Sequence, residues 1–170
     1  MRCSARSPSR SRSRLIAGTF TLEGVANAEN DFLTQVRAAF SFLEQARGFR
    51  LVSREASPSF GDALADFEAP TLRVRVLRDG SQVFVDVAPA QNAISWFDLP
   101  LLLTFLGEHD AADALLAGGQ RDMREVADLL RAHYDEIERT LGQLRSPDVV
   151  RRLSQLRLAR ANARFGGPDR

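Results

Sequence analysis

The chain has 170 residues, a hydrophobic content of 44% and a net charge of +1. This length supports one hydrophobic core rather than two comfortable domains, and the single cysteine, Cys3, excludes an internal disulfide framework. The unbroken apolar runs are far shorter than the about 20 residues that a membrane-spanning helix needs, so we expect no membrane span and a cytoplasmic protein.

Residues 1–14 form a basic segment in which serine and arginine alternate. The segment contains five arginines and no acidic residue, and all 23 basic residues of the chain are arginine, a bias typical of high-GC bacterial genomes. Such a composition cannot bury enough apolar surface to fold, so we predict that residues 1–26 are a disordered tail. Three interpretations stay open: a start codon assigned too far upstream or a neutral arm, an arm that binds nucleic acid through arginine–phosphate pairing, and a targeting peptide, against which Glu23 counts.

Residues 27–165 are predicted to form a single domain that begins with a helix from about Glu29 to Arg47. Apolar residues recur there at three- and four-residue spacing, and Gly48 suits a left-handed helix end. A short strand from Phe49 to Glu55 follows. The next stretch is a loop, and Ala63–Glu68 is either a strand with Phe67 inward or an irregular connection.

A β-hairpin is the clearest local signal in the sequence. Thr71–Arg78 and Ser81–Ala88 are both rich in β-branched residues, and Asp79-Gly80 between them favours a two-residue turn. That turn predicts a register that pairs Arg75 with Phe84 and Arg73 with Asp86. The apolar residues then share one face of the hairpin: Leu72, Val74, Val76, Val83, Val85 and Val87.

The rest of the chain is predicted to be mainly helical. Ile94–Phe97 is a candidate fourth strand, Asp98 and Pro100 suit the start of a helix, and Ala111–Leu116 is a candidate short helix. A long helix is expected over about residues 120–141, and a last helix starts at Ser146-Pro147 and ends before a flexible C-terminus at 166–170. We expect the inward side of the long helix to consist of Met123, Val126, Leu130, His133, Ile137 and Leu141. Strands and helices that are segregated along the chain predict an α+β fold, with an N-terminal helix, an antiparallel sheet of three or four strands and C-terminal helices.

The sequence offers no convincing catalytic, metal or cofactor site. His109 lies between two acidic residues, but neighbouring side chains on one chain do not converge easily on an ion, so a solvated acidic loop is the preferred interpretation. His133 is expected to be a boundary residue of the long helix rather than a base. Gly118-Gly119 precedes a helix without the lysine of a phosphate-binding loop. We therefore expect no cofactor and no enzymatic activity, with a hydrolase of unrecognised site as a remaining alternative.

Charge is segregated along the chain. Residues 15–146 carry 12 arginines and 20 acidic residues, whereas residues 147–170 carry six arginines and two acidic residues. In the last helix, Arg157, Arg160 and Arg164 share one side. That side is a solvated face, a contact for an acidic partner or phosphates, or a surface that lies against the acidic body of the same molecule.

Two segments carry a resemblance to known proteins. They are the run from Phe40 to Phe49, with Phe-Ser-Phe-Leu-Glu and Gly-Phe, and the paired runs Leu72–Val76 and Val83–Val87. In these segments the chain resembles small uncharacterised bacterial α+β proteins, some of which look like immunity or accessory partners of toxin systems. The resemblance implies a protein-binding role and assigns no functional residue.

The leading prediction is a non-enzymatic protein-binding module that contacts another protein through the polar face of the hairpin. The predicted contact residues are Arg73, Arg75, Phe84 and Asp86. The alternative is a nucleic-acid-associated protein that uses the N-terminal tail and the last helix as arms. The oligomeric state is left open.

Overall fold

The computed structural model describes residues 22–56, 62–91, 95–117, 121–144 and 146–166. For residues 22–29 and 165 it describes the backbone only. The predictions for residues 1–21, for Gly118-Gly119 and for 167–170 fall outside this part of the chain. Among the described residues, no helix is long and apolar enough to cross a membrane.

A five-stranded antiparallel sheet organises the domain, and the α+β fold class is confirmed. Each strand pairs with its neighbour in the chain, which gives the order β1-β2-β3-β4-β5. The strands are β1 (Arg50–Ala56), β2 (Ala63–Glu68), β3 (Leu72–Asp79), β4 (Gln82–Pro89) and β5 (Phe97–Asp98). The ambiguous segment before the hairpin is therefore a strand, and Phe67 points into the core with 1% of its surface exposed.

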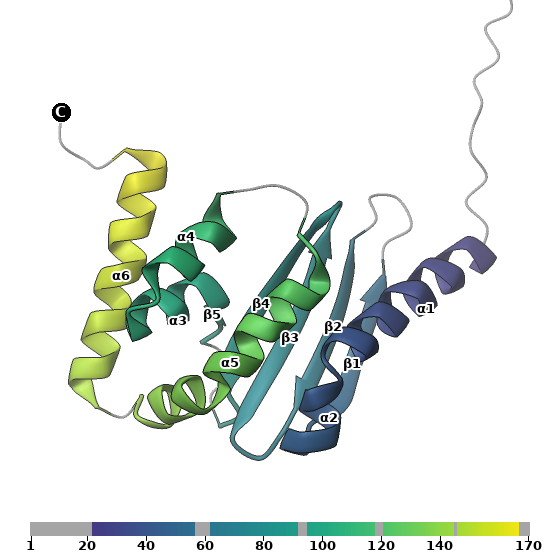
Figure 1. The fold of residues 1–170 in the computed structure, drawn as a ribbon, viewed down its shortest axis with the longest axis horizontal. Coiled ribbons are helices and arrows are strands. Elements are labelled where there is room, and N and C mark those ends of the chain that lie inside the picture. The colour runs from purple at the N-terminus through teal and green to yellow at the C-terminus, as the bar shows by residue number, and fades with distance from the viewer. Residues whose placement is uncertain (1–21, 57–61, 92–94, 118–120, 145, 167–170) are drawn as a thin grey trace, which may run out of the picture.

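Six helices accompany the sheet in the described chain: α1 (Leu22–Ala39), α2 (Ser41–Arg47), α3 (Leu99–Leu106), α4 (His109–Leu116), α5 (Met123–Gly142) and α6 (Pro147–Phe165). Helices α1 and α5 cover one face of the sheet, while α3, α4 and α6 gather beyond its β5 edge (Figure 1). The expected start and stop signals are present: Asp98 caps the start of α3 by accepting from the backbone N–H of Leu101, and Gly48 ends α2 with a φ of 69°.

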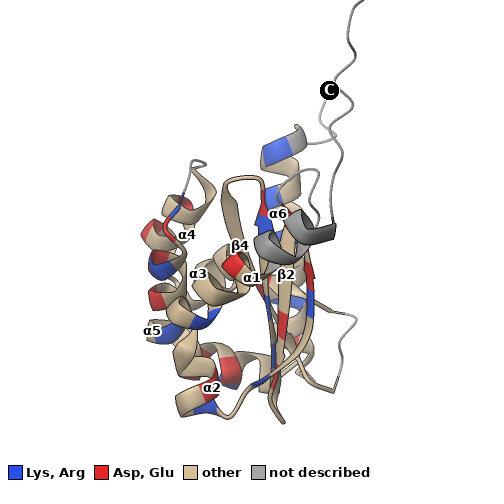
Figure 2. Cartoon of the chain, turned by 90° about the vertical axis from the view of Figure 1, so that its right-hand side faces the viewer, with Lys and Arg blue, Asp and Glu red and all other residues tan. Residues whose placement is uncertain are grey.

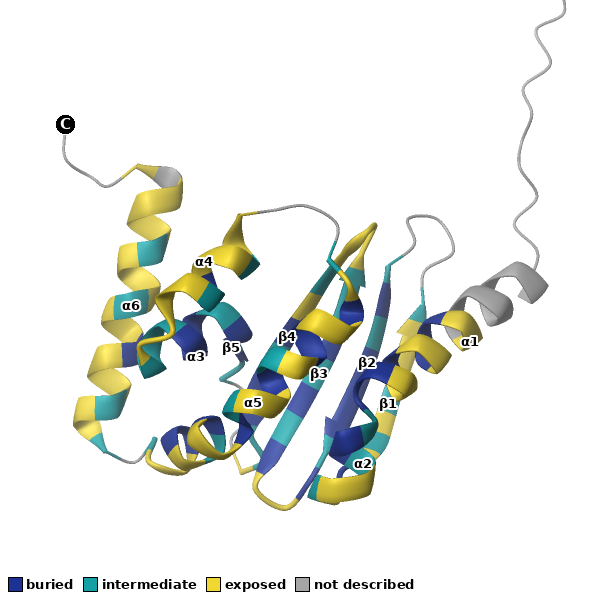
Figure 3. Cartoon of the chain, in the orientation of Figure 1, coloured by how far each residue is buried: buried dark blue, intermediate teal, exposed yellow. Residues whose placement is uncertain are grey.

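The core lies between the sheet and the pair α1 and α5, and it continues to the buried leucines of α3. Along β3 and β4 buried and half-buried residues alternate, as a sheet with one packed face requires (Figure 3). The packed face meets Phe32 and Val36 of α1 and Leu130 and Ile137 of α5, all of which are at most 1% exposed. Burial of one such side chain contributes about 1.5–3 kcal/mol.

The turn of the β3–β4 hairpin differs from the prediction. Asp79 pairs with Gln82, so Gly80 and Ser81 are the central turn residues, not Asp79 and Gly80. Gly80 has a φ of 56°, and no non-glycine residue of the described chain has a positive φ. A turn with positive φ at its first central residue alone is the type II′ arrangement, which favours glycine there.

This turn moves the predicted register by two residues, so the predicted pairs are wrong. Arg75 pairs with Asp86 instead of Phe84, and Arg73 pairs with Ala88 instead of Asp86. Because the shift is even, every side chain keeps the face that the sequence predicts.

Two helices also depart from the expectations. The first begins at Leu22, so residues 22–26 belong to α1 rather than to the tail, and it breaks at Phe40 before α2 starts. In α5, Tyr134 takes the buried position that the sequence assigns to His133: Tyr134 is 3% exposed, whereas His133 is half-buried at the boundary of the core. Tyr134 follows Leu130 by four residues and therefore lies on the same helical face.

Candidate functional site

The sheet has an outer face, made by the side chains that point away from α1 and α5. In the antiparallel register these side chains line up in rows across the strands. Strand β2 lies beside the hairpin in the sheet and not over it, so it leaves this face uncovered. The exposure is uneven, because Asp66 and Ala88 are buried whereas Phe84 is 44% exposed.

A polar row crosses the sheet and consists of Ser53, Asp66, Arg75, Asp86 and Asp98. Its centre is a bidentate ion pair, in which Arg75 Nε and Nη2 donate to the two carboxylate oxygens of Asp66 at 2.8 and 2.9 Å. The hydrogen bond to Asp66 raises the pKa of Arg75 above its ordinary value. Two parallel N–H···O bonds fix the plane of the guanidinium, so Arg75 is held rigidly in this row.

Trp96 lies against the other side of this arginine. The guanidinium carbon of Arg75 is 4.3 Å from the centre of the indole ring, a cation–π contact. Burial, followed by the neighbouring carboxylate of Asp98, raises the pKa of Asp86 above its ordinary value, although Arg75 and Arg157 oppose the shift. The row therefore places several acidic groups around one arginine.

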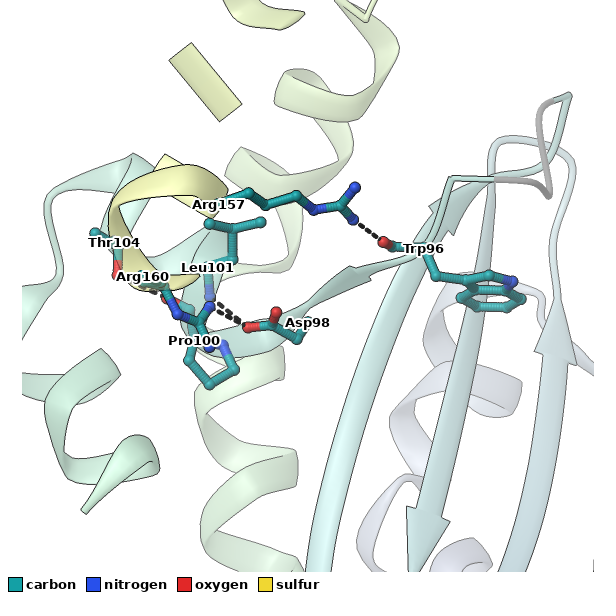
Figure 4. A network of polar contacts seen from close by, with 7 residues as sticks. All are labelled: Trp96, Asp98, Pro100, Leu101, Thr104, Arg157 and Arg160. Atoms are coloured by element: carbon teal, nitrogen blue, oxygen red, sulfur yellow. Dashed lines mark hydrogen bonds and ion pairs between the residues drawn. The ribbon is translucent and has the colours of Figure 1, made fainter. Parts of the chain in front are cut away.

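Helix α6 supplies the remaining positive charge at the β5 edge (Figure 4). Arg160 donates to Asp98 Oδ1 at 2.6 Å, and Arg157 donates to the backbone carbonyl of Trp96. Asp98 is also the cap of α3, so one carboxylate joins β5, α3 and α6. These contacts support the intramolecular interpretation of the basic helix, and Figure 2 shows basic residues on α6 and charges of both signs on the sheet.

An apolar row lies next to the polar row, toward the hairpin turn. It consists of Leu64, Leu77 and Phe84, which are direct neighbours across β2, β3 and β4. These three side chains line a hollow of about 590 Å³. The charged residues around this hollow are mostly acidic: Glu55, Asp62, Asp79 and Asp86, with Arg78 as the basic one. We call it the acidic hollow.

A second hollow of about 730 Å³ lies between β4, α4 and α6. Phe84 also lines this hollow, together with Leu115 and Leu116. Its charged residues are mostly basic: Arg121, Arg157, Arg160 and Arg164, with Asp98 as the acidic one. We call it the basic hollow. Phe84 thus stands between two depressions of opposite charge.

The structure brings the four predicted contact residues to the outer face, but they differ in accessibility. Arg75 is held by Asp66 and Trp96, and Arg73 lies 3.6 Å from Glu68. Asp86 is half-buried, which leaves Phe84 as the most exposed of the four. That these residues contact a partner stays a prediction.

The sequence reasoning missed Leu64, Leu77 and Trp96. A signal for Leu77 was present, because it is an apolar residue in the outward phase of β3, as Phe84 is in β4. No comparable signal marks Trp96, which reaches Arg75 only through the tertiary structure.

Both histidines of the chain lie on helices. His109 begins α4 and is exposed, and Nδ1 of His133 lies 3.8 Å from Glu136. No group of three or more histidine, cysteine or acidic residues within the described ranges is arranged to hold a metal ion. Cys3 lies outside those ranges.

A polar cluster borders the core where α5 meets α2. Burial, followed by the charge of Glu138, raises the pKa of Tyr134 to about 12. Arg47 covers the ring at 4.3 Å and pairs with Asp135 at 2.6 Å. A tyrosine that stays protonated under a paired arginine connects α2 to α5 and is poorly suited to act as a base.

Comparison with protein-family models, with curated proteins and with solved structures found no match to this chain. The resemblance to immunity-like and accessory bacterial proteins therefore stays a prediction.

Proposed function

We propose that this domain is a non-enzymatic protein-binding module whose contact surface is the outer face of the sheet around Phe84. The observation that carries the proposal is the exposure of Phe84, a large aromatic side chain with 44% of its surface accessible between two hollows. Exposed aromatic side chains bordered by apolar and polar neighbours are typical anchors of protein interfaces.

The polar row gives this surface a fixed shape. Because Asp66 and Trp96 hold Arg75 from two sides, the side chains next to the apolar row are ordered before any partner arrives. A preordered surface loses less conformational entropy on binding, which favours affinity. In this proposal Phe84 is the anchor, Arg75 and Asp86 shape the surface beside it, and Arg73 lies at its margin.

The proposed role is that of an accessory protein, immunity-like in kind, acting in the cytoplasm. The alternative is nucleic-acid binding through the N-terminal tail and α6. Two of the α6 arginines already contact β5 residues of the same chain, Arg157 the ring of Phe97 and Arg160 the carboxylate of Asp98, so the protein-binding proposal has the stronger support. A hydrolase with an unrecognised site is the third candidate.

The test is affinity capture from a bacterial lysate with three baits: residues 1–170, the same chain with Phe84→Asp, and the same chain with Val150→Asp. Val150 on α6 is a matched control, because it is also 44% exposed and lines neither hollow. We expect a stoichiometric protein that the wild type and Val150→Asp retain and that Phe84→Asp loses.

Nuclease treatment and a bait of residues 22–170 separate the alternatives. Capture that survives nuclease and does not need residues 1–21 supports protein binding. Capture that needs the tail, falls steeply with salt and disappears with nuclease supports the nucleic-acid alternative. Equal capture by wild type and Phe84→Asp contradicts the proposed surface.

A further inference from the structure

The two hollows differ in charge although they share a wall. Phe84 is the one described residue that lines both of them. The acidic hollow is lined by four acidic residues and one arginine, and the basic hollow by four arginines and one aspartate. The surface therefore has an electrostatic polarity centred on an apolar anchor.

The positive side keeps its charge despite its internal contacts. Arg160 is neutralised by Asp98, but Arg157 donates to a neutral carbonyl oxygen and covers the ring of Phe97. Contacts to a carbonyl and to an aromatic ring leave the formal charge of a guanidinium in place. The basic hollow consequently retains an excess of positive charge.

The negative side is assembled by the turn and the edge of the sheet. Asp62 accepts a hydrogen bond from the backbone N–H of Gly80 at 3.2 Å, which holds its carboxylate at the hairpin turn. Glu55 and Asp79 are exposed. Arg78, the single basic residue of this hollow, extends toward α1, with its guanidinium carbon 5.0 Å from the centre of the Phe32 ring.

From this charge complementarity we infer the chemistry of the partner segment, an inference that rests on the proposed function. The segment presents an apolar side chain to Phe84 and the apolar row, with basic residues on one side of it for the acidic hollow and acidic residues on the other for the basic hollow. A segment with flanks of a single sign meets repulsion in one hollow, and juxtaposed like charges oppose binding.

The test uses three fluorescein-labelled synthetic peptides and the full chain of residues 1–170. Each peptide has the same leucine–phenylalanine centre, and the flanks are arginine and glutamate on opposite sides, arginine on both sides, or glutamate on both sides. Fluorescence anisotropy at low ionic strength measures binding. We expect the mixed peptide to bind at least about tenfold more tightly than either single-sign peptide, and its affinity to fall as salt is added.

A charge reversal of the acidic hollow provides the sharpest readout. In the double variant Glu55→Arg and Asp79→Arg, the preference should move from the mixed peptide to the peptide with glutamate on both sides. The matched control is Asp113→Arg with Glu125→Arg, which changes the net charge equally at exposed residues outside both hollows. This control should keep the preference of the wild type.

The inference fails if a single-sign peptide binds as tightly as the mixed one, if no peptide binds, or if Phe84→Asp leaves mixed-peptide binding unchanged. It also fails if both double variants shift the preference equally, since bulk charge then explains the effect. Lysate capture that depends on Phe84 keeps the proposed function even when the peptides fail, whereas loss of both results removes the two together.

Discussion

The two faces of the sheet show how one strand serves two purposes. On the inner face, Val74, Val76, Val85 and Val87 are at most 2% exposed, and their shape is set by packing against α1 and α5. On the outer face of the same strands, the side chains range from buried Ala88 to exposed Phe84, are charged in part, and are ordered by ion pairs and cross-strand contacts. Stability should therefore depend mainly on the first set and recognition on the second.

Two phenylalanines test this difference most directly. Phe67 on the inner face is 1% exposed and Phe84 on the outer face is 44% exposed. We expect Phe67→Ala to lower the free energy of unfolding by about 3–5 kcal/mol, because it leaves a cavity in the core, and Phe84→Ala to lower it by less than about 1 kcal/mol. Urea unfolding followed by circular dichroism measures both, and equal losses would show that the outer face is packed like the inner one.

Removal of the central ion pair of the outer face should have the next largest effect on the free energy of unfolding. Arg75→Leu leaves the carboxylate of Asp66, a residue only 8% exposed, without its bidentate donor. A loss of about 1–3 kcal/mol in unfolding free energy is expected for a buried acceptor that loses its partner. The double variant Asp66→Leu and Arg75→Leu should recover most of that loss, because it removes both charges. A double variant that is no more stable than the single one contradicts this account.

Substitution of Asp98, whose carboxylate joins β5, α3 and α6, should have a smaller effect on the free energy of unfolding. Asp98→Ala removes the cap of α3 and the partner of Arg160, and should cost about 1–2 kcal/mol. Asp98→Asn keeps the capping oxygen and weakens only the ion pair, so it should cost about 1 kcal/mol or less, and less still in high salt. Hydrogen exchange in α3 and α6 distinguishes the two: Asp98→Ala should speed exchange in both helices, and Asp98→Asn mainly in α6.

The smallest effect concerns Asp86 and depends on pH. Its pKa is raised in the folded state, so folding favours its protonated form, and this contribution to stability is lost as pH rises from the ordinary aspartate pKa through the raised one. Asp86→Asn cannot ionise, so relative to the wild type it should gain stability as pH rises and lose that gain in acid. Unfolding free energies at a series of pH values give the difference, and a gain that increases in acid would reverse the predicted sign.

Much of the fold follows from local patterns, because its strands pair with their chain neighbours. Alternation predicted which residues of the hairpin face inward, and Asp98, Gly48 and Ser146-Pro147 marked helix ends correctly. The register was wrong because Asp79-Gly80 and Gly80-Ser81 are competing two-residue turns in the same sequence. Strand β2 was ambiguous because alanine and acidic residues dominate Ala63–Glu68, and its strand conformation depends on pairing with β1 and β3.

The candidate site was predicted only in outline. The polar face of the hairpin placed Arg73, Arg75, Phe84 and Asp86 together, since alternation depends on neighbouring residues alone. Its partners come from elsewhere in the chain: Trp96 lies 21 residues beyond Arg75, and Arg160 is 62 residues from the carboxylate that it contacts. Contacts over such separations depend on tertiary packing, for which the sequence carries no comparable local pattern.

The ends of the sheet have a consequence for self-association. An unpaired strand edge can recruit another chain and start aggregation when it is long, flat and apolar. In the described chain, β5 is two residues long and pairs only with Asp86 and Val87, so residues 82–85 of β4 lie at this edge beside no described strand. At the opposite end, β1 has an irregular register between Leu51 and Ser53, which interrupts the edge. This strand also carries three charged residues, Arg50, Arg54 and Glu55. The β1 edge is thus a poor template, and the chain should resist growth of its sheet into fibrils at this edge more than along residues 82–85 of β4.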